Sequence, residues 1–104
     1  LAYCIVEIRD IHPVHRWARL GIGLAREARG QGCGREALGL AEDYAWRVFG
    51  VRKIVLEVSA TNLAAIQLYK AAGYEQAGIH REHFFHDGRY MDVILMEKLI
   101  AKQS

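Results

Sequence analysis

The chain has 104 residues, of which 52% are hydrophobic and 25% charged, and this composition is typical of one globular domain and excludes a disordered or collagen-like chain. Its net charge of +2 is too small for a dense basic surface that binds nucleic acid, so we expect no nucleic-acid partner. No apolar run reaches the ~18 residues of a membrane span, so we expect no membrane partner. Two cysteines, Cys4 and Cys33, are too few for a disulfide scaffold and indicate a cytoplasmic protein, while the opening Leu1 indicates a piece of a longer polypeptide.

Two strands are predicted in the first quarter of the chain. Aromatic and β-branched residues over 1–8 and alternating apolar residues over 17–24 favour extended structure, with a turn at Pro13. Gly21 and Gly23 weaken the interior of the second strand. They indicate either a β-bulge or a close backbone approach.

A helix of about four turns is predicted over 35–49, ending at Gly50. Its apolar residues recur at steps of three and four, which predicts one buried stripe. The residues of this stripe are Ala37, Leu38, Ala41, Tyr44, Ala45 and Val48.

A strand and a second helix follow. The short branched segment 53–58 predicts a buried central strand. The helix is expected over 63–72, with Thr61 or Asn62 as its N-cap and Gly73 as its stop.

The chain closes with a predicted hairpin. Segments 74–85 and 89–99 flank Asp87 and Gly88, a dipeptide that favours a tight turn. The order β-β-α-β-α-β-β predicts an α/β (α+β) fold with one mixed, mostly antiparallel sheet, parallel where the helices cross over.

A glycine-rich turn joins the second strand to the first helix. Glycines let backbone N–H groups converge on an anion, and the helix N-terminus adds the positive end of its dipole. The spacing fits neither a P-loop nor the dinucleotide fingerprint, so a phosphate site and a ligand-free connection both remain open. The turn consists of Arg29, Gly30, Gln31, Gly32, Cys33, Gly34 and Arg35.

Together with a second segment, this turn resembles the GNAT acetyltransferase superfamily. Arg29, Gly32 and Gly34 are similar to its pyrophosphate-binding pattern, and segment 81–98 is similar to the branch of ribosomal-protein N-terminal and amino-sugar acetyltransferases. The resemblance implies that residues 1–104 are the C-terminal and cofactor-binding portion of a single acetyltransferase domain whose N-terminal part is missing. The later signature helix is matched by Asn62, Ala65, Ile66, Leu68, Tyr69, Gly73 and Tyr74.

The resemblance implies an N-acetyltransferase in which a primary amine attacks acetyl-CoA directly. The amine would belong to a protein N-terminus, an amino sugar, a polyamine or another small molecule. The pyrophosphate would lie on the backbone from Arg29 to Arg35, and the pantetheine arm would follow Ile22, Gly23 and Leu24 in a gap between splayed strands. The alternative is a catalytically inactive module that binds acyl-CoA without turnover, or a truncated fragment.

The same resemblance suggests roles for individual side chains. Tyr69 is expected to protonate the departing thiolate, because a phenol with a pKa of ~10 keeps its proton at neutral pH. Asn62 would bind the cofactor arm or cap its helix. The family often has an acidic residue where this chain has Arg19, so no general base is expected at that position. Glu57, Glu82, His83 and a water chain are the other candidates, and the base stays unassigned.

Three other features of the sequence also lead to expectations. On a regular strand His83 would face away from His80, which argues against a metal site. Direct acetyl transfer makes a nucleophilic Cys33 unnecessary. The apolar strand over 1–8 would be an exposed sheet edge, which predicts a homodimer or aggregation unless upstream residues cover it.

Overall fold

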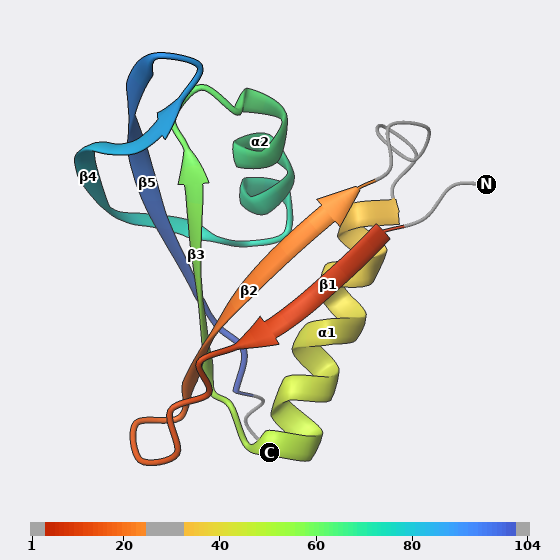
Figure 1. Cartoon of the computed structure of the whole chain (residues 1–104). Helices are drawn as coiled ribbons and strands as arrows, with labels where there is room; N and C mark the ends of the chain where they lie inside the picture. The colour runs from red at the N-terminus through yellow and green to blue at the C-terminus, as the bar shows by residue number, and fades with distance from the viewer. Residues whose placement is uncertain (1–3, 25–32, 102–104) are drawn as a thin grey trace.

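The computed structural model describes residues 4–24 and 33–101 (Figure 1). Each predicted element is present. In chain order they are β1 (Cys4–Arg9), β2 (Trp17–Leu24), α1 (Cys33–Phe49), β3 (Lys53–Ser59), α2 (Leu63–Ala71), β4 (Glu75–His86) and β5 (Arg89–Leu99).

The five strands form one mixed sheet in the order β1-β2-β3-β5-β4. Among the described strands, only β2 and β3 pair in parallel, and α1 crosses over between them. The other neighbours are antiparallel. At the second crossover β3 and β4 run in the same direction, as expected, but they do not pair, because β5 turns back at Asp87 and Gly88 and inserts between them.

Strands β2 and β3 separate along their length. They pair at Trp17 with Lys53, Ala18 with Ile54 and Arg19 with Val55. β2 then continues beside β1 as far as Leu24, while β3 continues beside β5 as far as Ser59. Figure 1 shows the two strands diverging, with α2 beside the far end of β3.

Helix α1 packs on the sheet through a narrower stripe than predicted. Leu38 and Ala45 are fully buried, whereas Tyr44 is 49% and Val48 55% exposed. Tyr44 and Val48 lie on a row roughly 100° around the helix from Leu38 and Ala45, beyond the contact with the sheet. The apolar pattern therefore contained two adjacent rows, and only one of them is buried.

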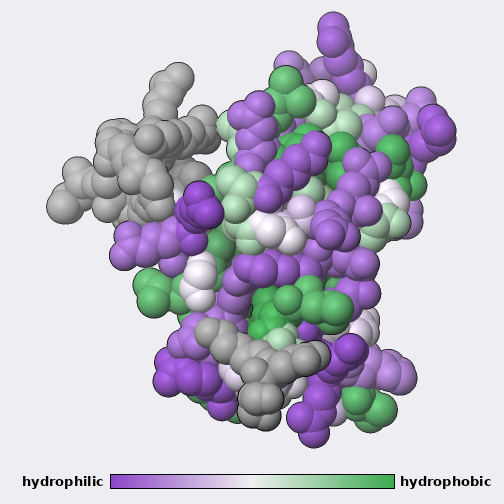
Figure 2. Space-filling model, turned by 180° about the vertical axis from the view of Figure 1, so that it is seen from behind, coloured by the Kyte–Doolittle hydropathy of each residue, from purple (hydrophilic) through white to green (hydrophobic). Residues whose placement is uncertain are grey.

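The core is completed by β3 and β5. Ile54 and Met96 are fully buried, and Tyr69 and Tyr74 close the side of the core near α2. Other apolar groups reach the surface among hydrophilic ones, as the rear view in Figure 2 shows. Within the described ranges, neither helix combines the length and apolar character needed to cross a membrane.

The ends of the elements follow local sequence signals. Asn62 is the N-cap of α2, and its Oδ1 accepts a hydrogen bond from the Ala65 N–H at 3.2 Å. Gly73 follows α2 with φ of +97°, a conformation that costs glycine little. Asp87 and Gly88 have φ of 54° and 77°, as a tight hairpin turn with two left-handed residues requires.

Strand β4 is irregular where two histidines lie. Its register with β5 shifts between His80 and Phe84, and Glu82 has φ of 48°. This irregularity brings the rings of His80 and His83 to 4.8 Å, so the expectation that they face opposite sides is wrong. In the described part of the chain, no three side chains of the His, Cys, Asp or Glu type gather as metal ligands.

Candidate functional site

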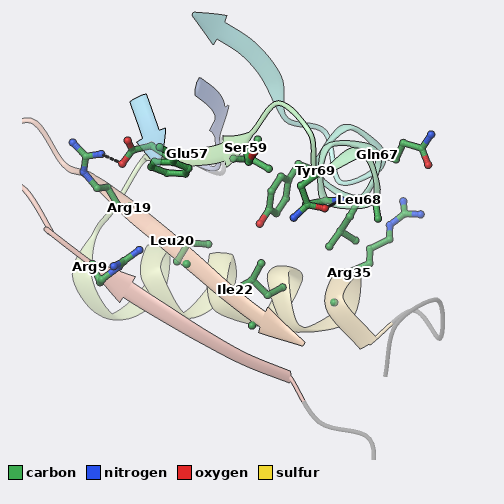
Figure 3. A pocket seen from close by; sticks show the side chains of 18 residues that line it. Arg9, Arg19, Leu20, Ile22, Arg35, Glu57, Ser59, Gln67, Leu68 and Tyr69 are labelled. Atoms are coloured by element: carbon green, nitrogen blue, oxygen red, sulfur yellow. Dashed lines mark hydrogen bonds and ion pairs between the residues drawn. The ribbon is translucent and has the colours of Figure 1, made fainter. Parts of the chain in front are cut away.

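A cleft of about 1080 Å³ lies where β2 and β3 separate (Figure 3). We call it the β2–β3 cleft. Its walls are β2, β3 and α2, with Arg9 of β1 at one end and Gly34 and Arg35 of α1 contributing at the other. The cleft therefore exists because the sheet opens after three paired residues.

Most of the predicted site residues within the described ranges line this cleft. They are Ile22, Gly23, Gly34, Arg35, Asn62 and Tyr69. Leu24 is the last residue of β2, and Cys33 is the first of α1. The expected phosphate contacts of Arg29, Gly30, Gln31 and Gly32 lie outside the described residues.

The two glycines of β2 have different surroundings. A β-bulge at this place is contradicted, because β1 and β2 pair residue for residue from Cys4 with Leu24 to Arg9 with Arg19. A Cβ on Gly21 would lie 2.9 Å from Arg9 Nη2, so this glycine leaves room for the guanidinium. A Cβ on Gly23 would meet no atom of the described residues within 4 Å, which leaves open space among them beside the strand.

The amino end of α1 borders the cleft. Gly34 is buried, while Arg35 is exposed. An α-helix carries partial positive charge at this end, and Arg35 adds a guanidinium that can pair with phosphate oxygens. This part of the cleft is suited to an anionic ligand.

Tyr69 projects from α2 into the cleft (Figure 3). The residue is 5% exposed, and the centroid of its ring lies 5.9 Å from that of Tyr74. Burial raises the pKa of Tyr69 above its ordinary value of 10.0, because the phenolate would lose solvation. Tyr69 therefore stays protonated at neutral pH and can donate a proton.

Asn62 lies at the amino end of α2 and caps this helix. Its Oδ1 accepts the capping hydrogen bond from the Ala65 N–H, and the same residue lines the cleft. The amide NH₂ takes no part in this cap and remains a donor by its chemistry. Of the two expected roles, the cap is confirmed, and contact with a cofactor stays a prediction.

The end of the cleft farthest from Arg35 holds an ion pair. Arg19 Nη1 donates to Glu57 Oε1 at 2.6 Å, drawn as a dashed line in Figure 3. Of the candidate bases named from the sequence, Glu57 lines the cleft, whereas Glu82 and His83 belong to the irregular part of β4. Among these candidates, Glu57 is therefore the one shown to line the cleft.

Several lining residues were not identified from the sequence: Arg9, Ser59, Gln67 and Phe84. Ser59 had a usable signal, because it follows Glu57 by two positions and so shares its face of β3. Arg9 could be identified only through its pairing opposite Arg19 across the β1–β2 hairpin.

Comparison with known proteins adds a family assignment. Residues 2–74 match the model of the Acetyltransferase (GNAT) family. The chain is 37% identical over 98 residues to the spermidine N(1)-acetyltransferase of Vibrio cholerae, covering 94% of this chain and 57% of that protein. It is 35% identical over 92 residues to the Escherichia coli K12 protein of the same name, covering 88% and 50%.

Solved structures give the same assignment. The spermidine N-acetyltransferase of Vibrio cholerae in complex with CoA and spermine superposes with a TM-score of 0.85 at 37% identity, covering 90% of this chain and 56% of that one. A dodecameric structure of the Vibrio cholerae enzyme gives 0.85 at 37% identity, covering 91% and 56%. The chain spans about half the length of the curated relatives it matches. With its five-stranded mixed sheet, two helices and family match, the chain belongs to the GNAT acetyltransferase family.

Proposed function

We propose that the chain is the cofactor-binding portion of an N-acetyltransferase that transfers the acetyl group of acetyl-CoA to a primary amine of a polyamine. The observation that carries this proposal is the β2–β3 cleft, with protonated Tyr69 inside it and the amino end of α1 at its border. The names of the relatives, spermidine N(1)-acetyltransferases, support the reaction and the acceptor.

The cofactor would occupy the cleft from the amino end of α1 inward. Its pyrophosphate would accept hydrogen bonds from the backbone between Arg29 and Arg35, and Arg35 would add charge. The pantetheine arm would follow Ile22, Gly23 and Leu24, where the absence of a side chain at Gly23 leaves space. A solved relative contains CoA and spermine, which supports this cofactor and this class of acceptor.

The chemistry is a direct acyl transfer. A neutral amine attacks the thioester carbonyl carbon, a C–N bond forms, and the oxyanion is stabilised by a backbone N–H near Leu24. The C–S bond then breaks, and the Tyr69 phenol gives its proton to the departing thiolate. The ammonium proton of the tetrahedral adduct passes to solvent, and Tyr69 regains a proton from water.

A polyamine is the acceptor class that the relatives favour. A protein N-terminus, an amino sugar and an amino acid also fit the sequence motifs, but the relatives named above act on spermidine or bind spermine. We further propose that the chain associates with copies of itself, since one solved relative is dodecameric.

The test is calorimetric titration of the 104-residue chain with acetyl-CoA, followed by an acetylation assay with spermidine. Saturable binding and formation of acetylspermidine are expected. A folded chain that binds acetyl-CoA but acetylates neither spermidine nor any amine of a panel would instead be a binding module without turnover. A folded chain that ignores acetyl-CoA would contradict the proposal altogether.

A further inference from the structure

An arginine and a glutamate meet at the apex of the β2–β3 cleft. Arg19 is the last residue of β2 that pairs with β3, and its Nη1 lies 2.6 Å from Glu57 Oε1. Both side chains line the cleft, and they lie at the opposite end from Arg35 in Figure 3. If the cofactor phosphates lie near Arg35, this apex is the space left for the acceptor.

The charges of the cleft are unbalanced. Among the described residues that line it, Glu57 carries the one carboxylate, against the guanidinium groups of Arg9, Arg19 and Arg35. A polyamine is a polycation, so it meets an excess of like charge in this cleft. Glu57 is therefore the lining residue able to receive an ammonium by a charge-assisted hydrogen bond, and Arg19 already occupies it.

Arg19 has other partners that it keeps when it leaves Glu57. Its Nε lies 3.4 Å from Asp10 Oδ2, and its Cζ lies 5.8 Å from the centre of the Trp17 ring. The side chain is 39% exposed, so the guanidinium also remains in contact with water. Exchanging one cation for another at Glu57 therefore leaves no charge buried without a partner.

We propose that Glu57 binds an ammonium group of the acceptor, and that Arg19 is the resident cation which this ammonium displaces. Arg19 then acts as a positioning residue that sets the affinity for polycations, through competition rather than through contact with the reacting atoms. This inference rests on the proposed function and adds the recognition group for its acceptor. It predicts that the two residues act on acceptor affinity as a coupled pair.

The test is a double-mutant cycle with Arg19→Gln, Glu57→Gln and both substitutions. The affinity for spermidine is measured by calorimetry on the CoA-loaded chain and, independently, as KM with saturating acetyl-CoA. Glu57→Gln is expected to weaken spermidine binding about tenfold, and Arg19→Gln to strengthen it about tenfold. In the Glu57→Gln background, Arg19→Gln is expected to change the affinity for spermidine by less than about threefold.

Two further variants distinguish the effect of the ion pair on spermidine affinity from the effect of the net charge of the cleft. Arg9→Gln removes the same charge from the same cleft, but Arg9 is paired with Glu7 at 4.0 Å, not with Glu57. It is expected to strengthen spermidine binding by less than about threefold, and by the same factor with and without Glu57. Arg19→Lys keeps a cation beside Glu57, so the affinity of this variant for spermidine should stay within about threefold of that of the unaltered chain.

The inference is overturned if Arg19→Gln weakens spermidine binding, or if its effect on spermidine affinity is the same with and without Glu57. It is also overturned if Arg9→Gln strengthens spermidine binding as much as Arg19→Gln does. Circular dichroism checks that each variant is folded, and the acetyl-CoA affinity should be equal in all of them. Failure of the proposed function has a different signature, because the unaltered chain would then fail to bind acetyl-CoA or to acetylate spermidine.

Discussion

Tyr69 combines two properties that a general acid for a thiolate requires. It reaches the β2–β3 cleft from α2, and burial raises its pKa above 10.0, so it holds its proton throughout the neutral range. We predict that Tyr69→Phe lowers kcat for spermidine about a hundredfold while the affinity for acetyl-CoA stays within about twofold. Steady-state kinetics and calorimetry check the two values.

The control for this prediction is Tyr44→Phe, which removes a phenol from the exposed side of α1. It should leave kcat and cofactor affinity unchanged, because Tyr44 lies outside the cleft. Equal turnover by the Tyr69→Phe variant and the unaltered chain would show that another group protonates the thiolate.

A second buried tyrosine serves stability. Tyr74 donates to Glu42 Oε2 at 2.8 Å, and Lys98 Nζ donates to Glu42 Oε1 at 2.8 Å and to the Ala72 carbonyl at 2.7 Å. These contacts join α1, the end of α2 and β5. Burial, and secondly the charge and hydrogen bond of Glu42, raise the pKa of Tyr74 far above 10.0.

This raised pKa gives stability a definite pH dependence. The folded chain keeps the Tyr74 proton at pH values where the unfolded chain loses it. The contribution of Tyr74 to the free energy of unfolding is therefore at its maximum below about pH 10 and decreases above it. We predict that Tyr74→Phe costs about 1 kcal/mol at pH 7 and flattens the decline between pH 9 and 11. Urea titrations at several pH values measure both; an unchanged decline would mean that other groups cause it.

At the scale of the elements, the separation of β2 from β3 makes the space for the cofactor. Gly23 lines that space, and within the part of the chain that the structure describes a Cβ there meets no atom within 4 Å. We predict that Gly23→Val preserves folding but weakens acetyl-CoA binding at least about tenfold, because the added branched side chain occupies the path of the pantetheine arm. Calorimetry measures the affinity, and thermal melting measures the fold.

Gly39→Val is the matched control. Gly39 lies on the exposed side of α1, and a Cβ there also meets none of the described atoms within 4 Å. It should leave the affinity for acetyl-CoA unchanged. If Gly23→Val binds the cofactor as tightly as this control, the pantetheine arm takes another route.

The elements themselves could be predicted because their signals are local. Gly50 and Gly73 follow the helices, and Asp87 with Gly88 forms the hairpin turn, as the sequence indicated. The irregularity at His83 could not be predicted. The Glu82 N–H donates to Asp92 Oδ1 at 2.9 Å, a contact with the neighbouring strand that no periodicity within β4 reveals.

At the scale of the whole molecule, the cleft-lining residues that belong to one sequence motif could be predicted. The contact that depends on the register between two strands could not. Tyr69 and Asn62 belong to one helix and its cap, so a short segment was enough to find them. Arg19 and Glu57 are 38 positions apart. Their contact depends on how β2 and β3 align, and the sequence did not specify that alignment.

The last prediction concerns the outer edge of the sheet. β1 is the end strand in the sheet order, and Ile5 on it is 56% exposed. An apolar end strand offers unpaired backbone groups to a second copy of the chain. We predict that the 104-residue chain forms dimers at about 100 μM in sedimentation velocity, and that Ile5→Lys shifts it towards the monomer without unfolding it.

The opposite edge of the sheet provides the control. Ile79 lies on β4, the other end strand, and is 49% exposed, so Ile79→Lys adds the same charge at a comparable site. If association runs through β1, Ile79→Lys leaves the dimer intact while Ile5→Lys disrupts it. A monomer at every concentration would refute the pairing. Disruption by Ile79→Lys alone would move the interface to β4, because lysine acts against the strand edge on which it lies.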